Sequence, residues 1–465
     1  MKYLPLFLLC QLAAQAAEKP NLIVIMADDL GYADVGFNGC TDIPTPHIDS
    51  IVKNGVKFTS GYAAYSVCGP SRAAFMTGRY GQRFGFERNP QYQTKDENMG
   101  LPFSEETIAN HLGKAGYHSG VIGKWHLGAT RKHHPLNRGF QEFYGHLGGG
   151  HQYFPEMLKL KDSYAAESES ESYRTWIMKN HEPVPPRKYL TDDFSDEAVG
   201  FIARNHEKPF FLFLSYNAPH TPLQAAPKYL DRFPGIKDKK RKIFAAMVSA
   251  VDDGVGRVLG ELRKKKIAEN TMIFFLSDNG GPSSKNASNN APLRGAKGDG
   301  WEGGYRVPFA VQWTSGLPKG TTYDHPVSAL DICATITGLN QVEIAAARPL
   351  DGVNLVPYLK GEKSEAPHES IFLRKFDSGI SAVRSGDYKY LSLEETGAAY
   401  VFNLTKDIGE RNSILEGSAE QLEKLRGLWA NWNTSNIDPV FLGLIHSKEW
   451  KKRAAQKKKK EASGK

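Results

Sequence analysis

Three runs of apolar residues constrain the fold of this chain most strongly. They occupy residues 21–26, 210–214 and 272–276, and each is almost continuous in hydrophobicity. Such runs are typical of central strands in a parallel sheet that is buried on both faces. A long helix is expected between the last two runs, with an apolar face formed by Ile243, Met247, Val251, Val255 and Leu262. Strands that alternate with helices predict an α/β fold, with a large, mostly parallel central sheet flanked by helices.

Polar side chains follow the apolar runs at the point where each strand is expected to end. Asp28 and Asp29 follow the first run, and Asp278 and Asn279 follow the third. Ligands of α/β sheets bind beyond the carboxyl ends of the strands. These four residues offer only oxygen ligands, which suit Ca²⁺ or Mg²⁺ better than zinc. The sequence therefore predicts a Ca²⁺ or Mg²⁺ site here. The alternative, in which these residues only cap the strand ends, would leave a buried acidic pair without a partner, which is costly.

The segment Cys68-Gly69-Pro70-Ser71-Arg72 carries the second chemical signal. Pro70 suits the first turn of a helix, and Gly78 suits its end. Cys68 is then expected at the helix N-terminus, where the helix dipole favours anions, and Arg72 lies four residues on along the same face. A small nucleophile and a fixed cation would thus face one anionic group. The alternative interpretation is a buried cysteine followed by an ordinary helix.

This segment resembles the Cys-x-Pro-Ser-Arg signature of the type I sulfatases, which belong to the alkaline phosphatase superfamily. Further segments match the family in the family's order: Gly123-Lys124-Trp125-His126, Ala218-Pro219-His220-Thr221-Pro222, and Leu293-Arg294-Gly295-Ala296-Lys297-Gly298. The resemblance extends from Asn21 to about Asn433. Two-zinc phosphatases of the same superfamily have a histidine where this chain has Asn279, so a second metal ion is not expected.

The resemblance implies a mechanism and its residues. A maturation enzyme would oxidise Cys68 to formylglycine (3-oxoalanine), whose hydrated aldehyde is the family's nucleophile. One Ca²⁺ would be held by Asp28, Asp29, Asp278 and Asn279. Arg72 and Lys124 would hold the nucleophile. His126 would act as a base and His220 as the general acid. Lys297 would bind the sulfate.

The substrate is less constrained than the chemistry. A secreted sulfatase of bacterial type is expected to act on sulfated polysaccharide, such as a marine galactan (carrageenan, for example) or a glycosaminoglycan. A polar insert over residues 153–187 and the loop before it are expected to shape the sugar site, with His151 and Arg294 as substrate contacts, and with residues 167–171 as a surface loop. Two alternatives are a phosphonate or phosphate ester hydrolase of the same superfamily and a non-catalytic binder of sulfated glycans.

The hydrophobic pattern of the sequence changes after about residue 366. Short alternating runs predict a small antiparallel sheet, and a final helix with Leu415, Leu422, Leu425 and Trp429 on its apolar side follows. We therefore expect a signal peptide at residues 1–17, a catalytic domain at 18–365, a C-terminal subdomain at 366–440 and a disordered basic tail at 441–465. The tail is interpreted as a solubilising end, with adhesion to acidic polysaccharide as the alternative.

Charge and targeting signals limit the kinds of partner that the chain can have. The formal net charge is +8, but nine Lys or Arg against two Glu between residues 448 and 465 supply +7 of it. The body is nearly neutral, so no nucleic-acid partner is expected. A charged start, an apolar run at residues 4–12 and an Ala-x-Ala site at 14–16 predict a secretory signal peptide. No later run reaches the roughly 18 apolar residues of a membrane span.

Cysteine usage fits export to the periplasm or the medium. Only Cys40, Cys68 and Cys333 follow the expected cleavage site, which is too few for a disulfide framework and suggests a bacterial enzyme. Once Cys68 is converted, Cys40 and Cys333 could pair or stay as thiols, and the sequence leaves both options open.

Overall fold

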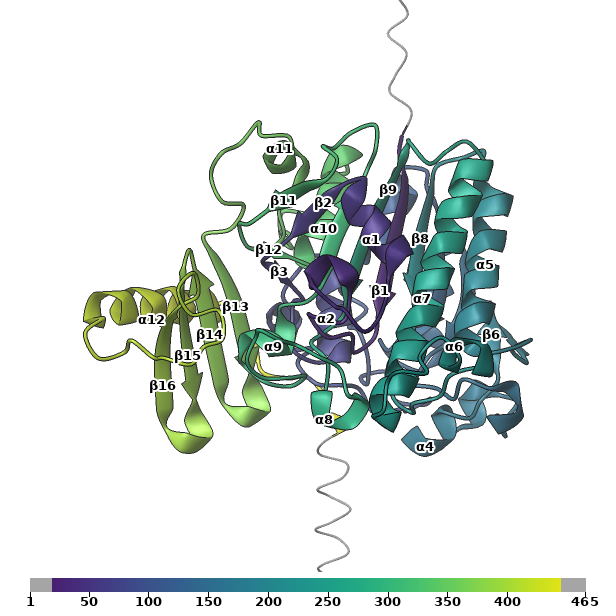
Figure 1. The fold of residues 1–465 in the computed structure, drawn as a ribbon, viewed down its shortest axis with the longest axis horizontal. Helices are drawn as coiled ribbons and strands as arrows, with labels where there is room; N and C mark the ends of the chain where they lie inside the picture. Colours follow the sequence, from purple (N-terminus) through teal and green to yellow (C-terminus); the bar gives the residue numbers. More distant parts are fainter. Residues whose placement is uncertain (1–18, 445–465) are drawn as a thin grey trace, which may run out of the picture.

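The structure is a computed structural model that describes residues 19–444. The expected signal peptide and residues 445–465 of the basic tail lie outside the described residues. The catalytic part is built on a ten-stranded sheet with the order β11-β2-β10-β9-β1-β8-β4-β5-β6-β7 (Figure 1). Its strands are β1 (Asn21–Ala27), β2 (Val56–Phe58), β4 (His118–Lys124), β5 (Glu142–His146), β6 (Ile177–Lys179), β7 (Glu182–Val184), β8 (Phe210–Ser215), β9 (Thr271–Ser277), β10 (Phe309–Gln312) and β11 (Thr321–Tyr323).

The centre of the sheet is parallel, as the apolar runs predict. β1 lies between β8 and β9 and pairs with both in parallel, so that Val24 stands opposite Phe213 on one side and Phe274 on the other. Every residue of β1, β8 and β9 is buried. β4 and β5 continue the parallel order beyond β8. Continuous hydrophobicity is required here because helices cover both faces of these strands.

Alternate residues of β1 pack against two different helical layers. Val24 and Met26 belong to the apolar core beneath α2 (Cys68–Thr77), α3 (Ile108–Lys114) and α10 (Leu330–Leu339). Ile23 and Ile25 belong to the core beneath α1 (Pro46–Lys53), α5 (Leu190–Asn205) and α7 (Lys239–Lys264). Figure 1 shows α5 and α7 side by side on the second face. α7 is the long helix that the apolar positions between residues 243 and 262 predict.

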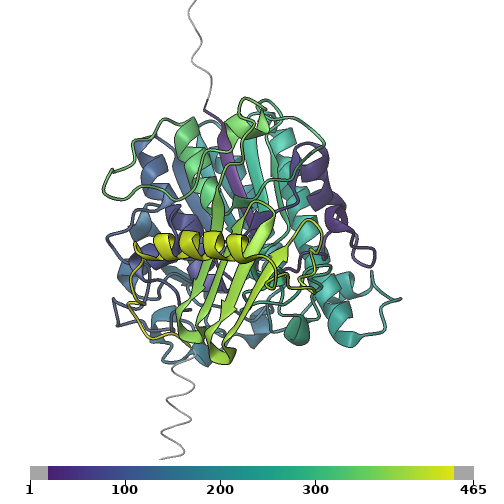
Figure 2. The same cartoon turned by 90° about the vertical axis from the view of Figure 1, so that its left-hand side faces the viewer.

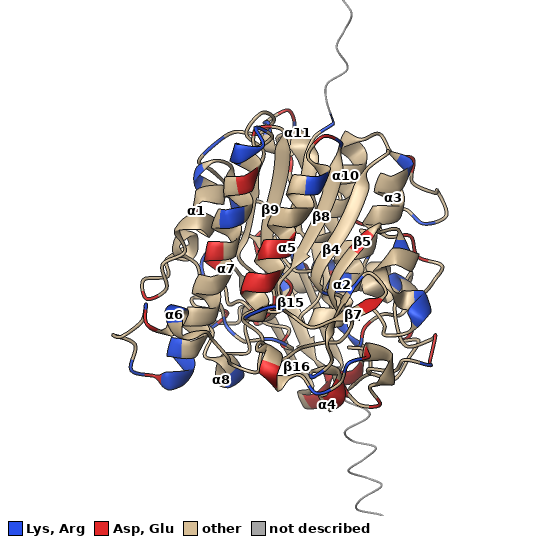
Figure 3. Cartoon of the chain, turned by 90° about the vertical axis from the view of Figure 1, so that its right-hand side faces the viewer, with Lys and Arg blue, Asp and Glu red and all other residues tan. Residues whose placement is uncertain are grey.

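The charged residues follow this layering. In Figure 3 the strands β9, β8 and β4 are tan over most of their length, whereas the helices α5 and α7 carry charged stretches. No helix among residues 19–444 is long and apolar enough to cross a membrane. The shorter elements of this part are β3 (Gly61–Tyr62), paired with β12 (Val327–Ser328), and the helices α4 (Glu169–Ser172), α6 (Pro227–Leu230), α8 (Ser283–Asn286), α9 (Glu302–Tyr305) and α11 (Val356–Leu359).

The start of α1 differs in one detail from the expected helix cap. Pro46 is the first helical residue, but the Thr45 side chain does not cap the helix. Its hydroxyl accepts a hydrogen bond from the Gly36 amide at 2.8 Å. The free amides of His47 and Ile48 donate instead to the carboxylate of Asp252, which lies on α7. A residue distant in sequence therefore performs the capping, which no local pattern could indicate.

The C-terminal subdomain is an antiparallel sheet with one helix, as the sequence predicts. Its strands are β13 (Ser370–Lys375), β14 (Ile380–Ser385), β15 (Tyr388–Leu393) and β16 (Ala398–Asn403), in sequential order. α12 (Ala419–Asn433) crosses one face of this sheet (Figure 2) and buries Leu425 against Val383 and Val401. Leu415 precedes the helix and packs against the same cluster.

The chain then returns to the catalytic part. Three backbone amides of this return segment donate to carbonyls of the catalytic domain: Ile437 to Gln82, Val440 to Gly85, and Leu444 to Asn89. Phe441 is buried. The sequence places residue 441 at the start of the tail, whereas residues 441–444 still pair with the body of the protein.

A buried ionic network joins the two sheets. Lys389 on β15 lies 3.0 Å from Glu302 on α9 and 2.7 Å from Glu410, and all three side chains are fully buried. Tyr62 donates to the second oxygen of Glu302 at 2.5 Å. Burial opposes ionisation of Glu302, but Lys389 and Arg306 outweigh it and hold its pKa at about 2. One lysine therefore balances two carboxylates that come from different domains.

Replacing Lys389 tests how much this network contributes to stability. Lys389→Met keeps a side chain of similar length but leaves Glu302 and Glu410 facing each other without a shared cation. Removing one partner of a buried ion pair costs about 3–5 kcal/mol, and we expect a loss of about that size in the free energy of unfolding, measured by urea denaturation. Lys406→Met, at an exposed position, is the control and should be neutral. A loss below about 1 kcal/mol for Lys389→Met would show that the network is dispensable.

Candidate active site

The carboxyl ends of β1 and β9 bring four polar residues together. The Asp278 amide donates to the carbonyl of Ala27 at 3.1 Å, and the Asp29 amide lies 3.3 Å from Asp278 Oδ1. Asp29 has φ 68°, a left-handed conformation that is uncommon outside glycine. Asp28, Asp29, Asp278 and Asn279 are all buried. The structure thus brings together all four residues that the sequence predicts as metal ligands.

Helix α2 presents the nucleophile candidate to this cluster. It begins at Cys68 and ends before Gly78, whose φ of 67° is the left-handed cap expected there. Cys68 Sγ lies 3.5 Å from Asp28 Oδ1 and 2.9 Å from Lys297 Nζ. Burial raises the pKa of the Cys68 thiol to about 12, against the opposing effect of Lys124 and Lys297, so the thiol is protonated at neutral pH.

Arg72 ties the helix to the ends of two strands. Its Nε donates to Asp278 Oδ2 at 2.8 Å, and its Nη1 donates to Ser215 Oγ at 2.5 Å. Burial alone would lower the pKa of this guanidinium, but Asp278 and Asp28 raise it. Ser215 ends β8, and its own hydroxyl donates to the carbonyl of Lys124 at 2.7 Å. The sequence places Arg72 in the site but gives no indication that Ser215 supports it.

Lys124 and His126 enter the site from the end of β4. Lys124 Nζ donates to Asp28 Oδ2 at 2.7 Å, and both side chains are fully buried. Gly123 is required before them because its φ is 109° and a Cβ there would lie 1.8 Å from the Ser215 carbonyl. His126 has φ 60°, and neither of its buried ring nitrogens has a hydrogen-bond partner among residues 19–444. Burial, reinforced by Lys124 and Arg72, holds the pKa of His126 well below its usual range.

Lys297 and His220 complete the group from two loops. Lys297 Nζ lies 2.5 Å from Asp29 Oδ1, and His220 Nε2 lies 3.6 Å from Asp29 Oδ2. His220 Nδ1 donates to the carbonyl of Thr221 at 2.6 Å, which fixes the ring with Nε2 toward the carboxylate. Burial lowers the pKa of His220, and Asp28 and Asp29 oppose that shift. All six residues of the expected catalytic set therefore surround the acidic cluster.

The donor set fits a hard divalent cation. Three carboxylates and one carboxamide converge, and Asn279 Nδ2 donates to Asp29 Oδ1 at 2.7 Å. That bond fixes the amide so that Asn279 Oδ1 is left buried, without a hydrogen-bond partner in the described part of the chain. A buried carbonyl oxygen without a partner is costly unless it binds something. Asn279 Oδ1 and the surrounding carboxylates have the chemistry that Ca²⁺ prefers.

His151 does not offer a free nitrogen to a ligand. Its side chain is buried, with Nδ1 2.8 Å from the Gln152 carbonyl and Nε2 2.9 Å from the Thr175 carbonyl. Its ring packs on His146 at a centroid distance of 4.9 Å. The expected contact between His151 and the substrate is therefore not supported by this geometry. A polar loop with three glycines indicates exposure, but the backbone folds over the histidine instead.

Arg294 lies beside the C-terminal subdomain, and its predicted contact with the substrate stays a prediction. Its guanidinium lies 3.6 Å from the ring centroid of Trp301, and its Nη1 donates to the Glu410 carbonyl at 2.9 Å. These contacts place Arg294 at the junction with the C-terminal subdomain. It is not among the residues that the structure gathers around Cys68.

The insert after β5 borders the site with its backbone. A Cβ on Gly149 would lie 2.8 Å from His126 Nε2, so this loop packs directly on the His126 ring. The stretch at residues 167–171, expected as a surface loop, contains the first turn of α4, whose Ser168 side chain accepts from the Glu171 amide as a cap. Glu169 accepts a hydrogen bond from the Tyr92 amide. The insert is therefore folded against the catalytic domain.

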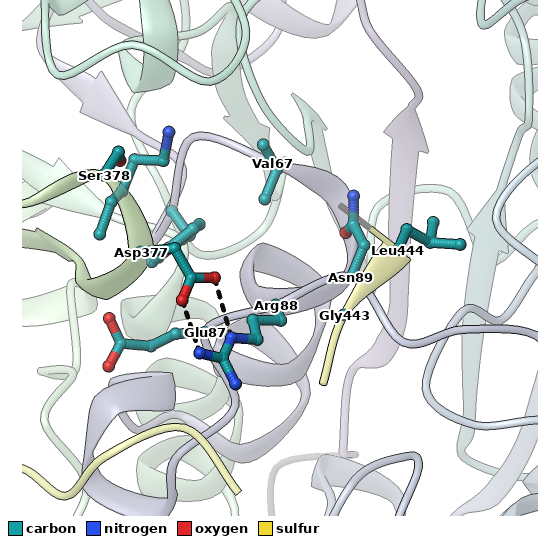
Figure 4. Close-up of a pocket in the computed structure, with 10 residues that line it drawn as sticks. Val67, Glu87, Arg88, Asn89, Asp377, Ser378, Gly443 and Leu444 are labelled. Carbon is teal, nitrogen blue, oxygen red and sulfur yellow. Dashed lines mark hydrogen bonds and ion pairs between the residues drawn. The ribbon is translucent and has the colours of Figure 1, made fainter. Parts of the chain in front are cut away.

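A pocket of about 230 Å³ lies between the catalytic domain and the C-terminal subdomain (Figure 4). It is lined from the catalytic domain by Val67, next to Cys68, and by Asn89, whose Oδ1 accepts from the Gly69 amide at 2.7 Å. Arg88 and Asp377 form a two-point ion pair on one wall. The pocket joins the two domains beside the start of α2, a feature with no sequence signal because its walls come from distant segments.

Comparison with known proteins agrees with this site. The family model described as Sulfatase matches residues 20–342. Steryl-sulfatase of Mus musculus is 33% identical over 430 residues, which cover 77% of this chain and 68% of the relative. N-acetylgalactosamine-6-sulfatase of Sus scrofa is 32% identical over 464 residues, which cover 88% and 84%.

Solved structures extend the similarity to the whole fold. The crystal structure of Ps i-CgsB superposes with a TM-score of 0.87 at 40% identity and covers 94% of this chain and 98% of that one. The same protein in complex with k-i-k-neocarrahexaose gives a TM-score of 0.86 at 40% identity, with coverage of 94% and 98%. PsFucS1 sulfatase from Pseudoalteromonas sp. gives 0.77 at 27% identity and covers 90% and 92%. The chain belongs to the sulfatase family and is a sulfuric ester hydrolase.

Proposed function

We propose that the chain removes sulfate esters from a sulfated polysaccharide or oligosaccharide, most favourably a galactan of the carrageenan type. The observation that carries this proposal is the 40% identity, over nearly the whole chain, to a structure that holds k-i-k-neocarrahexaose. A glycosaminoglycan is the alternative substrate class.

The proposed nucleophile is formylglycine at position 68, made by a formylglycine-generating maturation enzyme. The hydrated aldehyde would supply a hydroxyl that attacks sulfur where a thiol would not serve. Lys297 and Lys124 lie nearest to that position, since both are bound to the acidic pair that flanks Cys68. Their positive charges stabilise an oxyanion there and orient the sulfate for attack.

The proposed metal ion is one Ca²⁺, held by Asp28, Asp29, Asp278 and Asn279, with Mg²⁺ as the alternative. When bound, it would neutralise charge on the nucleophile and the sulfate oxygens. Arg72 positions Asp278 for this role through its bonds to Asp278 and Ser215. The otherwise unpartnered Asn279 Oδ1 would find its ligand there.

Two histidines are suited to the proton transfers. The Nδ1–H of His220 donates to the Thr221 carbonyl, so Nε2 faces the site. When the ring is protonated on both nitrogens, a form that Asp28 and Asp29 favour, Nε2–H can pass its proton to the departing alcohol oxygen. His126 has no partner on either nitrogen, so it can accept the proton that must leave the nucleophile before sulfate is released. General acid or base catalysis of this kind typically contributes roughly 10²–10⁴-fold.

The balance of charges favours a sulfate over a phosphate ester. Arg72, Lys124 and Lys297 match the three carboxylates, so a divalent cation leaves two positive charges for the nucleophile and the substrate. An oxyanion and a sulfate monoester carry one negative charge each and complete this balance, whereas a phosphate monoester dianion would exceed it. A phosphate monoester hydrolase therefore ranks second. A phosphonate ester is a monoanion like the sulfate ester, and it ranks second because the family model that matches is Sulfatase. The intact catalytic set disfavours a non-catalytic glycan binder.

We also propose export to the periplasm or the medium. The support is the sequence pattern at residues 1–17 and the small number of cysteines. Cys40, Cys68 and Cys333 are free thiols in the structure, so no disulfide occupies the Cys68 sulfur.

The substrate proposal is tested by sulfate release from a panel of defined oligosaccharides. The full chain, matured in a host with a formylglycine-generating enzyme, is expected to release sulfate from carrageenan oligosaccharides faster than from glycosaminoglycan fragments. A phosphate ester and a phosphonate ester serve as matched comparisons. Faster turnover of either would instead establish the second-ranked function.

The nucleophile is tested by mass and by substitution. Conversion of thiol to aldehyde should lower the mass of the peptide that contains residue 68 by about 18 Da. Cys68→Ala should abolish turnover and leave the unfolding temperature near that of the wild type, because the residue is a reagent. Cys333→Ala, at a buried cysteine of α10, is the control and should keep turnover. Persisting activity in Cys68→Ala would refute the assignment.

The metal site is tested by chelation. Thorough chelation should remove activity, and added Ca²⁺ should restore it. Asp278→Ala should lose both bound metal, measured by elemental analysis, and turnover, because Asp28 and Asp29 lose an essential co-ligand. Asp253→Ala, a carboxylate outside the site, should keep both. Full turnover by demetallated protein would contradict the proposal.

A further inference from the structure

Asn217 carries a buried side-chain amide that binds nothing. The residue stands two positions beyond the end of β8 and is 1% exposed. Within the part of the chain that the structure describes, neither its Oδ1 nor its Nδ2 has a hydrogen-bond partner. Leaving a buried polar group unpaired costs about 1–3 kcal/mol, so such a group calls for an explanation.

The backbone of β8 defines the direction in which this amide points. Ser215 directs its hydroxyl to Arg72, on the face that α2 covers. Tyr216 directs its hydroxyl to Ser195, on the opposite face that α5 covers. Side chains alternate between the two faces of a strand. Asn217 therefore faces the same side as Ser215 and Arg72, which is the side of the catalytic cluster.

Backbone contacts hold the segment around Asn217 beside the acidic cluster. Met26 and Ser215 are register partners of β1 and β8. Beyond these strands, the Asp28 amide donates to the Ala218 carbonyl at 3.1 Å. Asn217 therefore immediately precedes the residue whose carbonyl binds the Asp28 backbone. Lys124 Nζ binds the Asp28 side chain at 2.7 Å.

The backbone around Asn217 is held firmly. The Asn217 carbonyl accepts from the Tyr153 hydroxyl at 2.6 Å and from the His220 amide at 3.0 Å. The first bond ties the segment to the insert, and the second ties it to the general-acid histidine. An unpaired amide on a fixed backbone is preorganised to bind a ligand at little entropic cost.

We propose that Asn217 binds the sulfate group of the substrate, with Nδ2 donating a hydrogen bond to a non-bridging sulfate oxygen. This inference rests on the proposed function, because it requires a sulfate ester at the catalytic cluster. The carboxamide adds a donor without adding charge, so it leaves the charge balance of the site unchanged. Lys124 and Lys297 are already paired with carboxylates, whereas the Asn217 amide is free for the ligand.

The test compares Asn217→Ala with Asn217→Asp in the matured full chain. In Asn217→Ala, the inhibition constant of inorganic sulfate and the KM for 4-nitrophenyl sulfate should each rise about tenfold, which is the effect of losing one contact. Asn217→Asp has nearly the same shape but replaces the donor with a negative charge, so it should weaken sulfate binding more than alanine does. A packing role predicts the reverse order, because aspartate fills the space better.

Stability gives a second readout that separates the two roles. Since the amide is unpaired in the free protein, Asn217→Ala should unfold at the same temperature as the wild type or a higher one. Thr191→Val is the matched control, because Thr191 is equally buried and its hydroxyl is also unpartnered, on α5 away from the site. Sulfate inhibition and KM should not change in this control.

Three outcomes would overturn the proposal: unchanged sulfate inhibition in both Asn217 variants, loss of bound metal in Asn217→Ala, or a loss confined to glycan substrates. The failure of the proposed function is recognised separately. Direct calorimetric titration with inorganic sulfate measures the contact between Asn217 and sulfate without any turnover. If the wild type releases sulfate from none of the esters, the proposed function itself is refuted.

Discussion

The mutual neutralisation of six charges, five of them buried, at one edge of the sheet governs this structure. Asp28, Asp29 and Asp278 meet Arg72, Lys124 and Lys297 in a space from which water is largely excluded. Removing an ion from water costs several kcal/mol, so each group is tolerable only while its partners stay in place. The partners come from strand ends, a helix and a loop. The sheet, α2 and the loop must therefore keep their relative positions.

The C-terminal subdomain contributes to this requirement at a distance. The loop that carries Lys297 is held by the bond from the Gly298 amide to the Ser66 carbonyl at 2.8 Å and by Lys375, which contacts the Gly298 carbonyl. Glu302, at the start of α9, is held through Lys389 on β15. A small sheet without catalytic residues thus fixes the cation that lies nearest to Cys68. This arrangement explains why the two domains share a buried ionic network rather than a loose interface.

Sequence reasoning recovered the parts of this protein that local patterns encode. Continuous apolar runs identified β1, β8 and β9, and the polar residues after them located the site, because parallel strands end at one edge. The motif around Cys68 supplied the ends of α2. Sequence reasoning did not recover what depends on distant contacts. Asp252 caps α1 in place of Thr45, His151 is enclosed by its own loop, and Arg294 stacks on Trp301.

Ser215 and Asn217 show the same limit inside the site. Both follow an apolar run, so the sequence marks them as polar residues at a strand end, but it does not say which face they occupy. Only the register between β1 and β8 decides that, and register is a property of the folded sheet.

The burial of Cys68 also bears on the order of events during biosynthesis. The residue is 2% exposed, its thiol lies against Lys297 and Asp28, and the next amide is bound by Asn89. An enzyme that must grip several residues around this position cannot reach them once α2 has docked. The proposed oxidation therefore has to occur while the segment is still an unfolded chain. Folding ends the time in which residue 68 can be oxidised. Molecules that fold before oxidation therefore have the same structure but stay inactive.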